Sequence, residues 1–346
     1  GDGAGIARGV AVCRHIGCRE RRLHRREMDG AQPRASVYRS YMRPKTPLPP
    51  EFANTTFRYS DALENGITRG QIRASTTTGP HRGIRTTREI TSPRDADLAY
   101  ARASPRDVAL ASVSACRVWG IPLPLAIESR RHTFVAVRSP RHVPTGVAIT
   151  GIRLAPHLFS DREFEGVRLL SPCVAWAQLA AQLTPRETLV QADALLTRAD
   201  NYPGRRHGGS LATLDELRAV ADAWGKRAGV AQLRAAVELA RPQVESPGES
   251  RLRHALVSAR FPEPVLQHRV FDGRRFVARI DLAYPSLKIA LEYDGEHHFT
   301  VAKAVEDIER RRELESLGWI VIQITRHDIQ DPKRLFARLR SAMRSR

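Results

Sequence analysis

Residues 279–298 constrain the fold more than any other stretch of the chain, because acidic side chains alternate there with apolar ones. Successive side chains of a strand point to opposite faces, so this alternation predicts strands. A Pro-Ser pair interrupts the pattern and indicates a turn between two of them. On the first strand we expect Ile280 and Leu282 on one face and Asp281 on the other.

The second strand adds two more carboxylates. Glu292 and Asp294 take the face opposite the apolar residues Ile289, Leu291 and Tyr293, and Asp281 is expected to lie beside them. Three like charges that close together raise one another's pKa unless a cation lies among them. Mg²⁺ (or Mn²⁺) binds one or two carboxylates together with waters and phosphate oxygens. The hairpin therefore indicates a metal-dependent phosphodiesterase.

The residues on either side of the hairpin complete an α-β-β-β-α-β-α order. We expect helices over 246–259, 301–317 and 332–343, and further strands over 265–271 and 319–325. In the first helix Glu249 is in phase with Leu252 and Leu256, so it points toward whatever that helix packs on.

This order and its motifs resemble the restriction-endonuclease-like PD-(D/E)xK superfamily, and more closely an uncharacterised branch related to very-short-patch-repair endonucleases. The resemblance covers about residues 245–346. It depends on five motifs in order: Ser246–Ser250, Arg279–Leu282, Leu291–His298, Asp307 with Arg310, and Leu317–Val321. It implies that Asp281 and Glu292 bind the metal and that Glu249 is a further acid. It also implies that His298 donates a proton or orients a phosphate. Arg310 is a further candidate for contact with nucleic acid.

One position departs from the superfamily pattern. The lysine that usually follows the second acid by two residues, and that helps to position the attacking water, is Asp294 here. Relatives in the branch tend to carry Asp as well, so the departure is compatible with activity. It leaves the general base open between Lys288 and His298.

Each candidate also has a structural explanation. Glu249 follows Ser246 by three residues, as in a capping box. Asp281 and Glu292 are also explained as solubility charges on an edge strand, and Asp294 before a glycine as turn chemistry. Of the adjacent His297 and His298, at most one can face a site. Asp307 and Arg310 have the spacing of a surface ion pair on a helix.

Near the N-terminus, residues 57–72 predict a helix-turn-helix. Ser60 is expected to cap the first helix, Gly66 to end it and Thr68 to cap the second. The expected small core contains Ala62, Leu63, Ile67 and Ile72.

The second of these helices is expected to face DNA. Arg69, Gln71 and Arg73 would point outward from it, and Arg82 lies in a predicted wing strand over 80–85. The segment resembles the winged-helix domain of AbiEi-type antitoxins over about residues 48–90. The alternative is a small interaction domain that does not contact DNA.

Residues 91–240 predict an α/β region of unknown role. Expected helices cover 108–119, 172–183 and 186–196, with two more within 211–240, and expected strands cover 133–137 and 147–154. The region contains neither a nucleotide-binding loop nor a hydrolase or zinc-protease motif.

Composition supports a polyanionic partner. The chain has 346 residues and a net charge of +19, and such a surface attracts phosphates. Its four cysteines are scattered, which favours a reducing cytoplasm, and no apolar run approaches a membrane span. Residues 1–41 are expected to be either a disordered basic arm or an over-extended reading frame, since Met42 is a plausible natural start.

The sequence thus predicts a cytoplasmic α/β protein with an N-terminal winged helix, an α/β middle region and a C-terminal Mg²⁺-dependent endonuclease-like core that acts on DNA. One alternative is an antitoxin-like transcriptional regulator whose nuclease-like domain is inactive and serves docking or homodimerisation. Another is an RNase within a toxin–antitoxin or phage-defence system. No membrane partner is expected.

Overall fold

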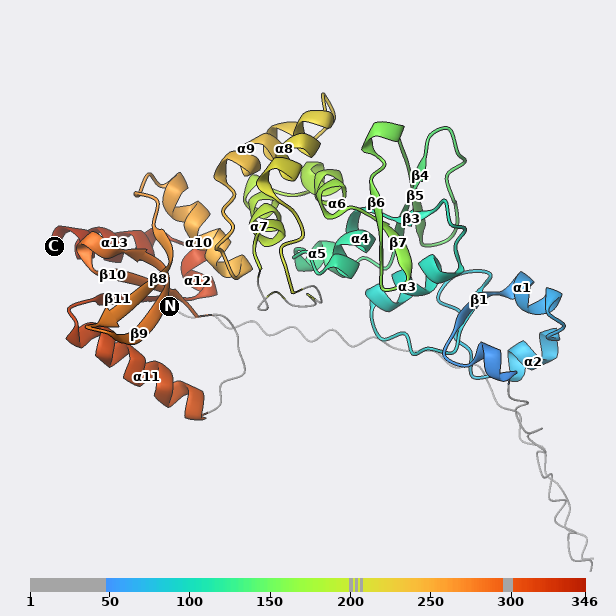
Figure 1. Cartoon of the computed structure of the whole chain (residues 1–346), viewed down its shortest axis with the longest axis horizontal. Helices are drawn as coiled ribbons and strands as arrows, with labels where there is room; N and C mark the ends of the chain where they lie inside the picture. The colour runs from blue at the N-terminus through green and yellow to red at the C-terminus, as the bar shows by residue number, and fades with distance from the viewer. Residues whose placement is uncertain (1–47, 199–201, 203–204, 206–207, 295–300) are drawn as a thin grey trace, which may run out of the picture. The chain divides into compact units, whose positions relative to one another are not determined.

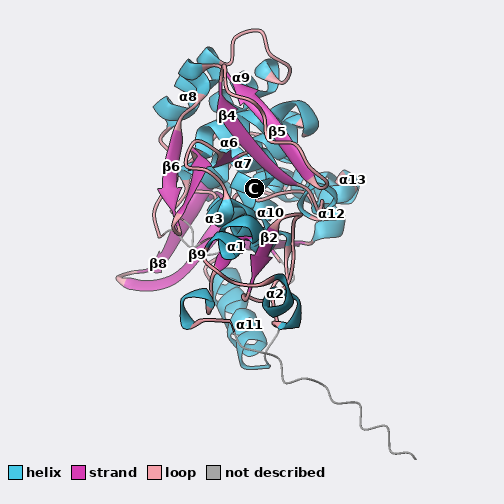
Figure 2. Cartoon of the chain, turned by 90° about the vertical axis from the view of Figure 1, so that its right-hand side faces the viewer, coloured by secondary structure: helices cyan, strands magenta, loops and turns pink. Residues whose placement is uncertain are grey.

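The computed structural model of the chain describes residues 48–198, 202, 205, 208–294 and 301–346. Segment 1–41 and residues His297 and His298 therefore lie outside the described residues. The described part of the chain contains three sheets, each in its own stretch of sequence and each accompanied by helices (Figures 1 and 2). The chain is a mixed α/β protein, as predicted. Within the described ranges, no helix is long and apolar enough to cross a membrane.

The first sheet belongs to the predicted helix-turn-helix segment. Its elements are η1 (Pro50–Phe52), β1 (Thr56–Arg58), α1 (Tyr59–Glu64), α2 (Arg69–Ala74) and β2 (Ile84–Thr86). The two strands pair antiparallel, with Thr56 opposite Thr86. Ala62, Ile67 and Ile72 form the buried core with Phe57, and Leu63 packs against it, so the predicted core is confirmed.

Two details of this segment differ from the prediction. Helix α1 begins at Tyr59, so its N-cap residue is Arg58, whose side chain has no oxygen to accept a capping hydrogen bond. The Tyr59 N–H donates to the carbonyl oxygen of Gly83 at 2.8 Å, and the expected cap, Ser60, lies inside the helix and hydrogen-bonds Asp61. The expected wing strand over 80–85 is shorter and later, since only Ile84–Thr86 pairs with β1. Thr68 caps α2 through a capping box with Gln71, as expected.

The second sheet has the order β5-β4-β3-β7-β6. Its strands are β3 (Ala109–Leu110), β4 (Thr133–Arg138), β5 (Ile149–Leu154), β6 (Asp161–Phe164) and β7 (Val167–Leu170). The accompanying elements are α3 (Pro93–Ala103), α4 (Ser112–Trp119), α5 (Leu125–Glu128), η2 (Pro156–Leu158), α6 (Pro172–Leu179), η3 (Ala180–Gln182), α7 (Pro185–Leu196), α8 (Leu214–Ala223) and α9 (Val230–Leu239). The core gathers around Trp176, which is fully buried in α6.

The predicted helix over 108–119 is wrong in its first part. Ala109 and Leu110 form the short central strand β3 between β4 and β7, and the helix begins only at Ser112. Every residue from 108 to 121 is buried, so the apolar run has no periodicity that separates a strand from a helix. The hairpin of β6 and β7 and the helix α3 were not predicted.

The third sheet has the order β11-β10-β9-β8 and forms the C-terminal unit (Figure 1). Its strands are β8 (Val265–Asp272), β9 (Arg275–Tyr284), β10 (Ile289–Tyr293) and β11 (Ile320–Ile324). Its other elements are α10 (Pro247–Ser258), η4 (Pro285–Leu287), α11 (Val301–Ser316), α12 (Arg326–Gln330) and α13 (Lys333–Arg344). The predicted α-β-β-β-α-β-α order is confirmed, with α12 as an addition.

Two apolar clusters hold this sheet between its helices. One joins Leu252 and Leu256 of α10 to Leu282, Leu291 and residues of α13. The other joins Leu314 of α11 and Trp319 to Ile280 and Ala290. The prediction that Ile280 and Leu282 share one face is therefore wrong. The ladder is distorted beside them, because Gln267, opposite Asp281 by the register of the flanking pairs, has a φ of 50°.

Candidate functional site

Asp281 and Glu292 face each other across two neighbouring strands. β9 and β10 pair antiparallel with Leu282 opposite Leu291, so the next position of the same register sets Asp281 against Glu292. Side chains directly opposite in an antiparallel pair lie on the same face. The two acids that the sequence singled out are therefore neighbours, although Leu282 and Leu291 end the hydrogen-bonded ladder.

Beyond the last backbone hydrogen bonds between β9 and β10, the Asp281 carboxylate accepts a hydrogen bond from the neighbouring strand. Its Oδ2 atom accepts the backbone N–H of Tyr293 at 3.2 Å, a donor that would otherwise bond to a backbone carbonyl of the neighbouring strand. The Tyr293 ring packs against the start of α10, where a Cβ added to Gly248 would lie 2.0 Å from a ring carbon. Only glycine fits this approach, which explains its place in the helix-start motif.

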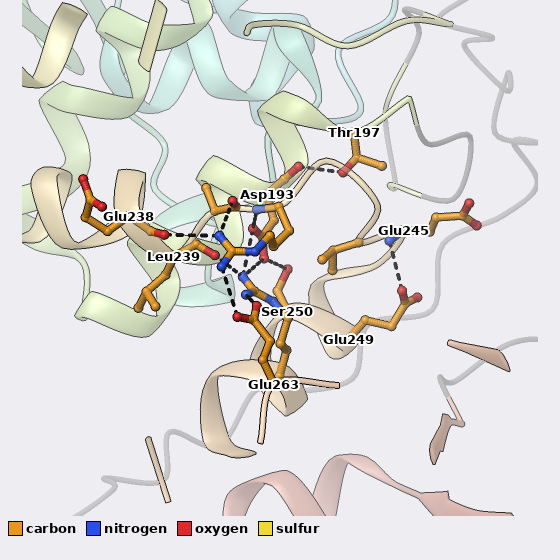
Figure 3. Close-up of polar contacts among 12 residues, drawn as sticks. Asp193, Thr197, Glu238, Leu239, Glu245, Glu249, Ser250 and Glu263 are labelled. Atoms are coloured by element: carbon orange, nitrogen blue, oxygen red, sulfur yellow. Dashed lines mark hydrogen bonds and ion pairs between the residues drawn. The ribbon is translucent and has the colours of Figure 1, made fainter. Parts of the chain in front are cut away.

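Glu249 brings a third carboxylate from the first turn of α10. Its N–H donates to Ser246 Oγ at 3.2 Å, so Ser246 caps the helix as predicted. The reciprocal contact of a capping box is absent, because Glu249 Oε2 accepts from Glu245 N at 3.0 Å (Figure 3). The same oxygen accepts from Gln267 Nε2 at 3.0 Å. Glu249 is buried, with 6% of its surface exposed.

Burial and mutual repulsion raise the pKa of these carboxylates. Burial raises the pKa of Glu249 to about 7, and the nearby charge of Asp281 adds to the increase. Burial also raises the pKa of Asp281, against the hydrogen bond from Tyr293 N–H and the charges of Arg310 and Arg279. The pKa of Glu292 is raised by burial, with Arg310 opposing and Asp281 reinforcing the shift. The three acids thus form one electrostatic cluster, called here the acid cluster.

Arg310 of α11 forms an ion pair with Glu292. Its Nη1 atom lies 3.4 Å from Glu292 Oε1, and its Nη2 donates to Asp307 Oδ1 at 3.1 Å, so the predicted i, i+3 ion pair is present. Glu292 Oε1 is buried and accepts no hydrogen bond from the residues that the structure describes. Arg310 therefore neutralises the carboxylate only in part.

The acid cluster has the donor chemistry for a hard divalent cation. Mg²⁺ needs only one or two protein carboxylates; Asp281 and Glu292 supply a facing pair, and Glu292 Oε1 still lacks a hydrogen-bond donor. No group of three or more His, Cys, Asp or Glu side chains in the described ranges is arranged closely enough to hold a metal. The expectation that Glu249 joins the other two within metal-bridging reach is thus not met.

Lys288 does not belong to this site. It follows η4 in a left-handed conformation, and its Nζ donates to the carbonyl oxygen of Leu317 at 2.9 Å. Four residues of strand separate it from Glu292, or about 13 Å at the usual rise. The expectation of a general base at Lys288 is therefore wrong. Asp294 is exposed, and its N–H donates to Ile324 O at 2.9 Å; His298 lies outside the described residues.

Two proteins of Mycobacterium tuberculosis, the uncharacterized proteins MT2308 and Rv2248, are each 32% identical to this chain over 200 residues. The match covers 55% of this chain and 70% of each relative. The chain belongs to their family. No protein-family profile matches the chain, and no solved structure matches it. The names of these relatives state no activity. The chemistry must therefore be inferred from the residues of the site.

In the N-terminal segment, the candidate DNA-contacting side chains differ in their solvent exposure and hydrogen bonding. Arg69 and Arg73 of α2 are exposed, and so is Arg82 in the loop before β2. Gln71 is half-buried, and its Oε1 accepts from both the N–H and the hydroxyl of Thr68 at 2.8 Å. The side chain of Gln71 is thus engaged in the capping box of α2.

A buried ion network behind the acid cluster was missed at the sequence level. Asp193 of α7 accepts from Ser250 Oγ at 2.8 Å, from Arg253 Nη2 at 3.2 Å and from Arg241 N at 2.8 Å (Figure 3). Arg253 also donates to Glu263 and to the Leu239 carbonyl. These contacts fix α10, which carries Glu249, to α7 of the preceding segment.

A second buried network ties α3 and α4 to the middle sheet. Asp97 accepts from Ser114 Oγ at 2.7 Å, from Thr133 Oγ1 at 2.7 Å and from Arg117 Nη1 at 2.9 Å. Arg117 also donates to the carbonyl oxygens of Glu128 and Arg130. The network therefore stabilises the packing of α3 and α4 against β4.

The pKa of Glu249 predicts how stability depends on pH. We expect Glu249→Gln to stabilise the protein at pH 8 in EDTA and to change little at pH 4.5. The pKa of Glu249 is about 7 in the folded state and about 4.5 in the unfolded chain. Above pH 4.5, folding therefore requires Glu249 either to take up a proton or to be buried as a charged group. The wild type loses this stability as the pH rises from 4.5 through 7, by about 3 kcal/mol at most.

Urea denaturation of the two proteins across this pH range measures the effect. The introduced amide would keep an oxygen acceptor for the Gln267 side chain but carries no charge, so only the wild type should weaken. Glu238→Gln, at an exposed carboxylate of α9, is the control and should follow the wild type. Parallel curves for wild type and Glu249→Gln would contradict the prediction.

Proposed function

We propose that this protein binds DNA and hydrolyses phosphodiester bonds with the help of a divalent cation. The observation that carries the proposal is the facing pair of Asp281 and Glu292 beside buried Glu249, three carboxylates with raised pKa in one cluster. Such an arrangement costs folding free energy and is typical of functional sites. The resemblance to restriction-endonuclease-like proteins supports the same function.

In this proposal each group has a defined task. Asp281 and Glu292 would hold Mg²⁺ or Mn²⁺, which would lower the pKa of a bound water and neutralise charge on the phosphate. The Tyr293 N–H orients Asp281. Gln267 and Glu245 N orient Glu249. Arg310, at 36% side-chain exposure, is placed to meet both a carboxylate and a phosphate.

The N-terminal segment supplies the DNA-binding part of the proposal. Its two short helices, its antiparallel strand pair and the exposed Arg69, Arg73 and Arg82 support a winged helix. A cytoplasmic location is part of the same proposal, supported by scattered cysteines of which Cys116 and Cys173 are free and buried.

A second candidate has a specific observation in its favour. The superfamily lysine is replaced by Asp294, and Lys288, the nearest alternative in the hairpin, is held by Leu317. An inactive nuclease-like unit would serve docking or homodimerisation in an antitoxin-like transcriptional regulator. This candidate requires DNA binding without cleavage.

One experiment separates the two. Purified protein is incubated with plasmid, linear duplex, single-stranded DNA and RNA, each with Mg²⁺, Mn²⁺ or EDTA. The nuclease proposal expects cleavage of a DNA substrate that EDTA abolishes. Cleavage of RNA alone would assign the activity to an RNase. The absence of cleavage under every condition, together with duplex binding, would favour the regulator.

The exposed arginines of α2 give a prediction for binding. Arg69→Ala and Arg73→Ala should each weaken duplex binding and reduce the slope of log affinity against log salt by about one unit, because each removes a phosphate contact. Fluorescence anisotropy with a labelled duplex at several salt concentrations measures both effects. Arg234→Ala, at an exposed position of α9, is the control. Unchanged slopes for both α2 variants would remove α2 from the interface.

A further inference from the structure

A cleft of about 960 Å³ lies between the middle and C-terminal segments, beside the strand end that carries the acid cluster. Its middle-segment wall contains α5 and the start of α7. Its C-terminal wall contains Arg251 of α10, the end of β10 and α12. Of its lining, only Tyr293 and Asp294 belong to a motif that the sequence singled out.

The cleft is basic. Among the residues that the structure describes, its lining has four arginines, Arg130, Arg186, Arg251 and Arg326, against two carboxylates, Glu187 and Asp294, with an exposed histidine, His327, at α12. An excess of cations inside a concave surface focuses the field on an anionic ligand.

The two walls are held in place before any ligand enters. Arg251 donates from Nε and Nη2 to the two carboxylate oxygens of Glu187, both at 2.9 Å, in a bidentate pair that joins α10 to α7. The buried pair of Arg253 and Asp193 joins the same two helices. Since Arg251 and Glu187 neutralise each other, this pair adds little to the field of the cleft.

Two of those arginines are well placed to meet phosphates. Arg130 is exposed, and its Nη1 donates to Gln182 Oε1 at 2.7 Å, a neutral partner that leaves its charge uncompensated. Arg186 has 42% of its side chain exposed, and its Nε lies 3.5 Å from Glu187 Oε1. Glu187 therefore pairs with both Arg186 and Arg251. The apolar wall beside them includes Leu125, which is 78% exposed. Cations next to apolar surface suit a strand of nucleotides, with phosphates on one side and bases on the other.

Several residues that line the cleft are close in sequence to members of the acid cluster. Tyr293 and Asp294 line it and directly follow Glu292, and the Tyr293 N–H holds Asp281. Arg251 lies two residues after Glu249 on α10. A ligand in the cleft would therefore contact residues adjacent to two members of the cluster.

We propose that this cleft binds a single nucleic-acid strand through its phosphate backbone and guides it to the acid cluster. The volume is that of a small-molecule site, so a few nucleotides of one strand enter it and a duplex does not. The guiding role depends on the proposed nuclease function, whereas strand binding does not. Because the contacts are to phosphates, DNA and RNA strands share this chemistry.

The test is binding of labelled single-stranded DNA and RNA oligonucleotides by the full chain in EDTA. The double variant Arg130→Ala/Arg186→Ala should weaken single-strand binding about tenfold. It should also reduce the slope of log affinity against log salt by about 1.4, since each phosphate contact on a single strand contributes roughly 0.7 to that slope. Duplex binding should stay unchanged. Arg218→Ala, at a half-exposed arginine of α8, is the control and should behave as the wild type. Melting temperatures verify that each variant is folded.

Two results would overturn the proposal: single-strand binding that is unaffected by the double variant, or an equal loss of single-strand and duplex binding. These outcomes are separate from the failure of the proposed nuclease function. If no substrate is cleaved but the double variant still loses single-strand binding, the cleft is a strand-binding site and only its guiding role fails. If duplex cleavage occurs with single-strand binding unchanged in the variant, the nuclease stands and the cleft proposal falls.

Discussion

Replacing Asp193 with alanine is expected to destabilise the protein by about 3–5 kcal/mol, because the buried guanidinium of Arg253 would lose its fully buried counter-charge and keep only the partly exposed Glu263. Both side chains of this pair are almost fully buried, at 0% and 1% exposure. Arg241 N and Ser250 Oγ would lose their acceptor as well. Differential scanning calorimetry should show a fall in melting temperature of about 10 °C.

The control and the coupling test use the same chain. Asp215→Ala removes a carboxylate that is 92% exposed on α8 and should change stability by less than about 0.5 kcal/mol. Arg253→Met combined with Asp193→Ala should cost less than the sum of the two single changes, because no unpaired buried charge remains. Additive effects would mean that the two side chains do not act as a pair.

The hairpin of β9 and β10 was predictable because its charges interrupt strands that are otherwise apolar. Strict alternation set Asp281 and Glu292 apart from Leu282 and Leu291, and the register then placed the two acids opposite each other. Alternation could not reveal the distortion at Gln267, since a positive φ at a non-glycine residue leaves no sequence signal. For that reason the expected common face of Ile280 and Leu282 was wrong.

The position of Lys288 shows that two residues close in sequence can lie far apart in a strand. Four residues look close along a chain, yet an extended strand carries them about 13 Å apart. In a helix the same spacing would have placed Lys288 beside Glu292. The turn conformation of Lys288 then directs its amine to the end of α11, where Leu317 accepts it.

The buried networks could not be assembled from the sequence. Asp193 stands between alanines in an apolar helix, and Asp97 is flanked by alanine and leucine, so each is a local signal of a paired buried charge. Their partners lie far along the chain, however; Arg253 is 60 residues from Asp193. Only the fold selects one of the many arginines. The same reason hid the basic cleft, whose two walls come from distant segments.

Asp281→Asn is expected to reduce metal-dependent DNA cleavage by about 10³-fold or more, because a metal supplies several kcal/mol of transition-state stabilisation. Asparagine keeps the size of the side chain and an oxygen that can accept the Tyr293 N–H, so the fold should survive. DNA binding should be unchanged or tighter, since a negative charge near the phosphates is removed. Single-turnover cleavage with Mg²⁺ and binding in EDTA measure the two effects separately. Asp272→Asn changes a carboxylate at the exposed tip of the β8–β9 hairpin and should cleave as the wild type does. Equal cleavage by Asp281→Asn and the wild type would assign the activity to another site and leave the acid cluster without a catalytic role.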